Sequence, residues 1–442
     1  MALPGWRRTF LLGLTVGLSD AGGACGTVEQ PCTDCDSCEV GCPPLPDPEI
    51  VGLMVAGGQN AAFAGDTFTL HTWYTDSTGA PMGVFPSGVR WASSDSSVVE
   101  PLGDTAFVAR GLGTVTLTAE APVEGAVFTA SREFHVIVPV QSRLTWLRGT
   151  GALQSVQVVW MDLPGRTVRA VTGFDGADGL GRPALSPDRR ALAVQVSGYQ
   201  GGLPLSRVYV VDLTSGAVSP LADSVPGQQI APRWSADGTE VLFAANPGGW
   251  NIWSAPIAGG PARMRLRLDW ASPVFFDVSR STPRAVVELA NPLTNQSEIW
   301  QAVLDSGLVG PIGLQGGGPR LSPSDQTVAY QGYSDRDATY VVLVARAGAA
   351  PEPLLPAVLV PRSPEYRTWT GVAGSNPGSW LATDSFLLVE WAVDPHYVAA
   401  EDPPGGTATF SNLGELYAVS SDGRYRVRLT NWPWANALAD SR

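Results

Sequence analysis

The feature that most constrains this chain is an internal repeat in its C-terminal two thirds. The segment "ALSPDRRALAVQVS" at 184–197 returns as "RWSADGTEVLFAAN" at 233–246 and as "RLSPSDQTVAYQGY" at 320–333. A worn copy, "SWLATDSFLLVEWA", stands at 379–392, and a more degenerate one, "PVFFDVSRSTPRAVVEL", at 273–289. A second pair of apolar strands follows each copy. Repeats of roughly 40–60 residues with four short strands each are typical of propeller blades, so the pattern predicts an all-β fold.

The best copies carry a short polar turn between two apolar strands. In Ser-Pro-Asp the proline presets the backbone dihedral at the second position of a type I turn, and the Ser and Asp side chains bond nearby amides. We therefore predict that Asp188, Asp237 and Asp325 are structural turn residues. The same pattern argues against a role for them as metal ligands or catalytic acids.

This motif resembles the TolB-like propeller repeat, which occurs in the periplasmic TolB protein and in the propellers of prolyl oligopeptidase-type enzymes. The resemblance covers residues 141–442 and implies a six-bladed β-propeller. The motifs account for five blades, and residues 142–172 supply only three strands of a sixth. The C-terminal "NALADSR" (436–442) echoes "PALSPDR". We predict that it is the missing strand of the first blade, because a closed ring leaves no free sheet edge.

Residues 48–140 alternate with a period of two, as half-buried strands do. One face of "DTFTLHTWYTDSTG" collects Phe68, Leu70, Thr72 and Tyr74. About seven short strands separated by turn residues predict a small β-sandwich. Gly65-Asp66, "VRWASSDSSVV" and "ARGLGTVTLTA" resemble the bacterial immunoglobulin-like group 2 domain of invasin- and intimin-type surface proteins. That resemblance implies a small Ig-like spacer or adhesion module without catalytic residues, in which Trp91 is a packing residue.

The N-terminus has the three parts of a signal peptide, over residues 1–24. Arg7 and Arg8 precede the apolar run "TFLLGLTVGL" and the small residues "SDAGGA". The run is too short to span a bilayer permanently. "GGAC" resembles a bacterial lipoprotein cleavage site and implies lipid on Cys25, although Gly22 stands where that family has leucine; the alternative is ordinary cleavage with Cys25 free or paired. "RRTFL" also resembles a twin-arginine export signal. The alternative is that the two arginines only supply the positive charge that any signal peptide has near its N-terminus.

The remaining cysteines lie close together in the predicted tether, residues 25–47: Cys32, Cys35, Cys38 and Cys42. Their spacing, followed by Pro43, is that of a ferredoxin iron–sulfur loop, in which the fourth cysteine serves a second cluster. The sequence contains no second run, and the proline-rich flank "GCPPLPDPEI" has nothing apolar to shield a cluster. With Cys25 lipidated, an exported protein can pair the other four. We expect two disulfides of undetermined connectivity, with zinc or another metal and an iron–sulfur cluster as alternatives.

The composition and the motifs argue against several kinds of activity. A net charge of −13 argues against nucleic-acid binding, because neutralising phosphates needs a basic face. All 28 basic residues are arginine, which removes phosphate-loop lysine, Schiff-base and pyridoxal chemistry. The sequence has no Gly-x-Ser-x-Gly elbow and no following hydrolase domain, so peptidase activity is not implied. His396 with Asp394, Glu401 and Asp402 does not make a metal site by itself, and no histidine pair has zinc-ligand spacing. We expect no cofactor and no metal.

Three functions fit these observations. We favour a binding or scaffold lipoprotein, exported and anchored to the cell envelope on its periplasmic or outer face, whose propeller contacts a protein or glycan partner. The second is a propeller enzyme acting on extracellular glycans or small substrates, which would gather carboxylates at the channel mouth. The third is an electron-transfer protein with an iron–sulfur site at Cys32–Cys42. Fold alone does not decide between the first two. Five tryptophans are expected mainly to pack between blades, and exposed ones could form a platform: Trp250, Trp253, Trp300, Trp369 and Trp391.

Overall fold

The computed structural model describes residues 49–441 apart from 80, 83–85, 124, 150–155, 175–176, 178, 201–202, 292–293, 295, 336–338, 348, 356–358, 361–370, 373–374, 382, 392–395, 399–408, 412–414 and 431–435. Residues 48–442 form one compact unit. The predicted signal peptide, Cys25 and the cysteines Cys32, Cys35, Cys38 and Cys42 lie outside the described residues. No helix in the described part of the chain is long and apolar enough to cross a membrane.

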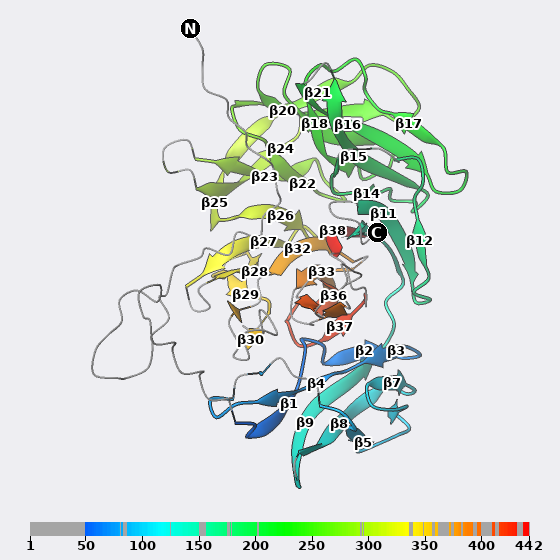
Figure 1. The fold of residues 1–442 in the computed structure, drawn as a ribbon. Helices are drawn as coiled ribbons and strands as arrows, with labels where there is room; N and C mark the ends of the chain where they lie inside the picture. The colour runs from blue at the N-terminus through cyan, green and yellow to red at the C-terminus, as the bar shows by residue number, and fades with distance from the viewer. Residues whose placement is uncertain are drawn as a thin grey trace, which may run out of the picture. The chain divides into compact units, whose positions relative to one another are not determined.

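Six sheets follow one another along the chain after the N-terminal module, and we number them blades 1 to 6 (Figure 1). Blade 1 contains β12 (Val168–Ala170), β11 (Val156–Leu163), β10 (Ser142–Gly149) and β38 (Asn436–Ser441). Blade 2 contains β13 (Gly179–Leu180), β14 (Ala184–Leu185), β15 (Ala191–Gln200), β16 (Leu203–Asp212) and β17 (Val218–Pro220). Blade 3 contains β18 (Gln229–Trp234), β19 (Glu240–Ala245), β20 (Trp250–Pro256) and β21 (Arg263–Trp270).

The other three blades repeat this order. Blade 4 contains β22 (Phe275–Val278), β23 (Arg284–Ala290), β24 (Ser297–Val303) and β25 (Gly307–Gln315). Blade 5 contains β26 (Gly317–Leu321), β27 (Thr327–Ser334), β28 (Thr339–Arg346) and β29 (Glu352–Pro353). Blade 6 contains β32 (Ser375–Trp380), β33 (Phe386–Trp391), β36 (Glu415–Ser420) and β37 (Arg426–Arg428). Two small hairpins pair β30 (Leu359–Val360) with β31 (Gly371–Val372), and β34 (His396–Val398) with β35 (Thr409–Ser411).

The inner strands of the six blades form a closed ring. Strand β14 contacts β18, β18 contacts β22, β22 contacts β26, β26 contacts β32, β32 contacts β38, and β38 contacts β14. The C-terminal strand β38 pairs antiparallel with β10, so blade 1 combines both ends of the propeller sequence. Apolar side chains of successive blades pack against each other, as Leu242 and Ile252 of blade 3 do against Phe276 of blade 4. The all-β, propeller-like fold predicted from the repeats is confirmed.

The N-terminal module, residues 49–140, has its own core. Strand β1 (Gly52–Val55) pairs with β4 (Thr72–Thr75), and β3 (Thr67–Thr69) with β7 (Ala106–Ala109), which also pairs with β6 (Val99–Pro101). A third sheet holds β2 (Ala61–Phe63), β9 (Ala126–Ile137), β8 (Gly113–Val123) and β5 (Arg90–Ser93). Phe68 stacks on Phe107 and Phe134, which come from two different sheets. Trp91 is partly buried against Phe107 and its indole N–H donates to the Asp104 carbonyl (2.8 Å), so it packs as expected.

The alternating segment around residue 70 is divided between two sheets. Strand β3 pairs with β7, whereas β4 pairs with β1. Leu70 lies between the two strands and is still buried, so the burial pattern continues while the hydrogen-bond partner changes. A period of two indicates which side chains of a strand are buried. It does not indicate which neighbouring strand pairs with it.

The module and blade 6 share one continuous sheet. Strand β2 runs parallel to both β9 and β37, where Ala61 pairs with His135 and with Val427. The Asn60 side chain donates to the Arg424 carbonyl (2.9 Å) and accepts from the Arg426 amide (2.8 Å). The outer edge of blade 6 is therefore covered by the module, which removes an exposed sheet edge.

Candidate functional site

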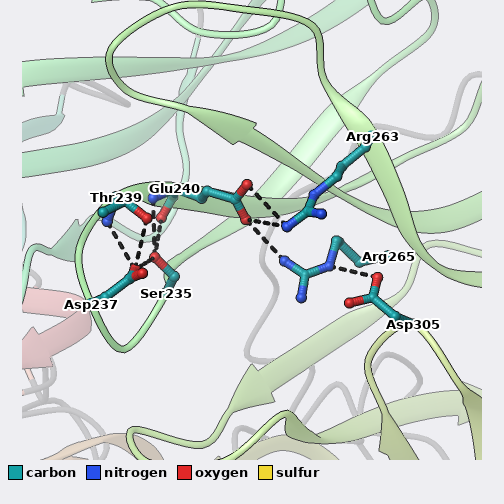
Figure 2. A network of polar contacts seen from close by, with 7 residues as sticks. All are labelled: Ser235, Asp237, Thr239, Glu240, Arg263, Arg265 and Asp305. Carbon is teal, nitrogen blue, oxygen red and sulfur yellow. Dashed lines mark hydrogen bonds and ion pairs between the residues drawn. The ribbon is translucent and has the colours of Figure 1, made fainter.

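The turns that the repeat predicts are built by their own side chains. The Ser186 hydroxyl donates to the Asp188 carboxylate (2.6 Å), which also accepts from the Arg190 amide (3.0 Å). The Ser235 hydroxyl donates to Asp237 in the same way (2.7 Å; Figure 2). These serine hydrogen bonds come first among the causes that hold the pKa of both aspartates below the usual range. Both carboxylates are engaged within their turns, as a structural role requires.

Asp325 is placed differently. Ser324 stands where Asp188 stands in blade 2, and Asp325 follows it in a left-handed backbone conformation (φ 63°). Its carboxylate accepts hydrogen bonds from the Ser279 hydroxyl (2.6 Å) and the Thr282 hydroxyl (3.0 Å) of the blade 4 turn. Asp325 thus joins two neighbouring blades. It stands one position later in its turn than Asp188 does, so its carboxylate contacts the turn of blade 4 and not its own.

Blade 6 contains one turn of the same type that was not predicted from the repeats. Between β36 and β37 the Ser420 hydroxyl donates to Asp422 (2.5 Å), and Asp422 accepts from the Arg424 amide (3.0 Å). Gly423 occupies the left-handed position (φ 72°) that Gly238 occupies in blade 3 (φ 73°). The sequence "SSDGR" at 420–424 could have predicted this turn, because it has the Ser-x-Asp-Gly pattern of the other turns. It lies outside the five copies of the repeat.

Residues of all six blades meet between the inner strands. One cavity of about 10 Å³ lies there, lined by residues of all six blades, and its volume is about that of a single water. Arg233 of blade 3 pairs with Asp277 of blade 4 (Nε to Oδ1, 3.0 Å). The second oxygen of Asp277 accepts from the Leu321 amide of blade 5 (2.9 Å). These contacts connect three blades through one buried ion pair.

Asp440 connects the blades on the other side of the ring. It accepts from the Leu185 amide of blade 2 (2.7 Å) and from the Ser379 hydroxyl of blade 6. Burial lowers the pKa of Arg320 in blade 5 to about 10, and the charge of Asp440 opposes that effect. The charges at the channel axis therefore hold the blades together, and a paired, buried charge is what such a site requires.

Polar side chains on the second strands join neighbouring blades in the same manner. The Glu288 carboxylate accepts from the Gly318 amide (2.8 Å) and from the Ser297 hydroxyl (2.9 Å), and burial raises its pKa. The side-chain amide of Gln331 donates to the Ser375 carbonyl (3.3 Å). Among the described residues no three His, Cys, Asp or Glu side chains lie close enough together to hold a metal ion.

A charged network on the outside connects blades 3 and 4 (Figure 2). Glu240 accepts from Arg265 (2.9 Å) and pairs with the more exposed Arg263 (3.2 Å). Arg265 also pairs with Asp305 in the turn between β24 and β25 (2.8 Å). One guanidinium thus bridges two blades.

The tryptophans are not the exposed aromatic residues of the propeller. Trp250 and Trp391 are buried, Trp253 and Trp300 are partly buried, and Trp369 lies outside the described residues. Packing between blades accounts for the four that the structure describes. A tryptophan platform is therefore absent from the described part of the chain.

Three tyrosines are the most exposed aromatic residues of the described propeller, and Phe275 on β22 is 46% exposed. Tyr199 near the end of β15 is 71% exposed, and Tyr333 and Tyr340 on the β27–β28 hairpin are 53% and 58% exposed. The rings of Tyr333 and Tyr340 lie 5.5 Å apart, edge to face. Both hairpins join the second and third strands of their blades, so they open toward the same end of the propeller, from blades 2 and 5 on opposite sides of the ring. We call these three residues the tyrosine end.

Solved structures share this fold. TolB from Acinetobacter baumannii is 14% identical, with a TM-score of 0.50 over 75% of this chain and 80% of that protein. A putative TolB from Agrobacterium tumefaciens is 14% identical, with a TM-score of 0.46 over 67% and 91%. The β-propeller domain of the Trilobed protease from Pyrococcus furiosus is 9% identical, with a TM-score of 0.38 over 87% and 97%. No protein-family model and no curated protein matches the chain. The similarity to TolB from Acinetobacter baumannii shows that the chain has a TolB-like propeller fold.

Proposed function

We propose that this chain is a binding protein of the cell envelope, exported and anchored by lipid on Cys25, whose propeller contacts a protein or glycan partner at the tyrosine end. The exposure of Tyr199, Tyr333 and Tyr340 carries the proposal. Tyrosine offers a large, rigid apolar area with a polar tip, and such side chains dominate the energy of binding surfaces. The cavity between the inner strands has a volume of about 10 Å³, which is too small for a substrate, so we place the partner on the surface.

The N-terminal module fits this role as a spacer of the bacterial immunoglobulin-like type. Its sheets bury Phe68 and Phe107, and in its described part no three His, Cys, Asp or Glu side chains lie close enough together to hold a metal ion. The pairing of β2 with β37 would hold the module in a fixed position against blade 6. The tether itself, residues 25–47, lies outside the described residues.

Site-specific photo-crosslinking tests the platform. A photo-reactive residue replaces Tyr333 in the full chain in its native envelope, and a matched control replaces Ile257, which is 48% exposed in the turn between β20 and β21 at the other end of the propeller. We expect a defined adduct from position 333 and none from 257. Digestion of the adduct with a protease or with glycosidases identifies the class of partner. No adduct at 333, or the same adduct from both positions, would contradict the proposal.

The intact mass of the mature protein, before and after reduction and alkylation, tests the anchor. We expect a diacyl or triacyl group on Cys25 and four further cysteines that alkylate only after reduction. Four cysteines that react without reduction, together with iron and sulfide in the sample, would instead support the electron-transfer alternative.

A further inference from the structure

We propose that four arginines of blades 1 and 2, two of which stack on Trp160, form a second binding surface, for a short acidic segment of a partner protein. We call it the arginine patch, and it consists of Arg143, Arg169, Arg189 and Arg190. Two of these guanidinium groups lie over the Trp160 ring, Arg143 at 4.3 Å and Arg169 at 4.9 Å from its centre. Cation–π contacts of this kind hold an arginine in place and leave its edge free to donate hydrogen bonds.

The other two arginines come from the neighbouring blade. Arg143 donates to the Arg189 carbonyl (2.6 Å), which places the turn between β14 and β15 beside β10. A hydrogen bond from Arg143 and then the charges of Arg143, Arg169 and Arg189 lower the pKa of Asp162, so these arginines act on one carboxylate. Arg190 follows in the same turn. Residues of blades 1 and 2 therefore form one basic area.

This area carries a small excess of positive charge on a protein whose net charge is −13, because its four arginines face three carboxylates, Asp162, Asp188 and Asp212. Asp162 accepts two hydrogen bonds from Arg143 (2.6 and 2.9 Å), and Asp188 accepts from Ser186 in its own turn. Asp212, near Arg190, accepts from the Thr214 and Ser215 amides of its own turn (2.8 and 2.7 Å). No described residue accepts a hydrogen bond from the side chains of Arg169, Arg189 or Arg190, and Arg169 and Arg190 are exposed. These guanidinium groups are available to a partner.

The charge distribution favours a short acidic segment over a wide anionic surface. A membrane surface or a nucleic acid extends across the molecule and meets its overall negative charge. A short segment feels mainly charges within a screening length of about 8–10 Å, and in this area the four arginines outnumber the three carboxylates. Carboxylates also match the two-pronged geometry of arginine, as Asp162 does with Arg143 in this structure.

The arginine patch is independent of the tyrosine end. Arg189 and Arg190 lie in the turn that enters β15, and Tyr199 lies near the other end of that strand. A partner could therefore contact either surface without the other. Failure of one proposal leaves the other standing.

The test uses a short fluorescein-labelled polyglutamate peptide and the full chain, with fluorescence anisotropy at low ionic strength. We expect the wild-type chain to bind and the Arg169→Glu/Arg190→Glu variant to bind about tenfold more weakly. The control Arg90→Glu/Arg284→Glu changes the net charge equally at two exposed arginines outside the patch and should retain binding. Thermal unfolding of each variant shows whether its fold is intact, and Tyr333→Ala should leave peptide binding unchanged.

Three results would overturn the proposal. The wild-type chain could fail to bind the peptide, or the control could lose as much affinity as the patch variant, which would indicate general electrostatics. Phosphatidylglycerol vesicles could also bind the chain in a way that Arg169→Glu/Arg190→Glu abolishes and phosphatidylcholine vesicles do not reproduce. That last result would assign the patch to a lipid surface.

Discussion

Replacing Asp440 by alanine should be among the most damaging single changes in the propeller. This carboxylate belongs to blade 1, is 6% exposed, and accepts hydrogen bonds from Leu185 of blade 2 and Ser379 of blade 6. Its charge also opposes the desolvation of Arg320 in blade 5. Asp440→Ala therefore leaves two donors buried without an acceptor and removes a charge that favours a buried guanidinium.

The expected loss follows from these contacts. A hydrogen bond to a charged group contributes about 1.5–3 kcal/mol, so two of them predict that Asp440→Ala lowers the free energy of unfolding by about 3–6 kcal/mol. Asp440→Asn keeps the shape and one acceptor oxygen, and should lower it by about 1–3 kcal/mol. Asp335→Ala, at an exposed turn residue, should change it by less than about 0.5 kcal/mol.

Denaturant unfolding followed by the fluorescence of the 15 tryptophans measures these differences. The expected order of stability is wild type and Asp335→Ala, then Asp440→Asn, then Asp440→Ala. An Asp440→Ala variant within about 1 kcal/mol of wild type would refute the reasoning. Equal losses in Asp440→Asn and Asp440→Ala would show that the charge matters and that the hydrogen-bond account is wrong.

Three further predictions concern the ring and its joint with the module. Deletion of residues 435–442 removes β38 and should sharply lower the melting temperature in calorimetry; an unchanged transition would refute closure by this strand. Burial holds the pKa of His135 below 6.5, so protonation of this side chain favours the unfolded chain. The free energy of unfolding should therefore fall as the pH drops below about 6.5. In His135→Gln the denaturant midpoint should depend less on pH over this range. Arg265→Ala should lower the free energy of unfolding by about 1–2 kcal/mol, because it removes the ion pairs with Glu240 and with Asp305 of blade 4. Arg263→Ala, at a side chain that is 60% exposed, should lower it by less than about 1 kcal/mol. Equal losses in denaturant unfolding would contradict this prediction.

Much of the fold is predictable from the sequence because its signals are local. Alternating apolar residues and the Ser-x-Asp turns lie within a few positions of one another, so the hydrogen bonds at Asp188 and Asp237 need only their own neighbours. The same local rule fails at Asp325, where a shift of one residue gives the carboxylate a partner in another blade. The candidate binding surfaces were not predicted, because exposure of Tyr333 and Tyr340 depends on how far one hairpin extends past its neighbours.

By itself the sequence determined that this chain is an all-β protein with a repeated, propeller-like part, since strand periodicity and turn chemistry act over a few residues. Tertiary structure alone decided which distant groups meet. It brought Ala61 beside Val427 to join the module to blade 6. It also placed Asp440 against the Leu185 amide and Arg143 against the Arg189 carbonyl of the next blade. Those contacts depend on closing a ring of six sheets, where the register of one blade against the next is set by packing and by buried charges over the whole chain.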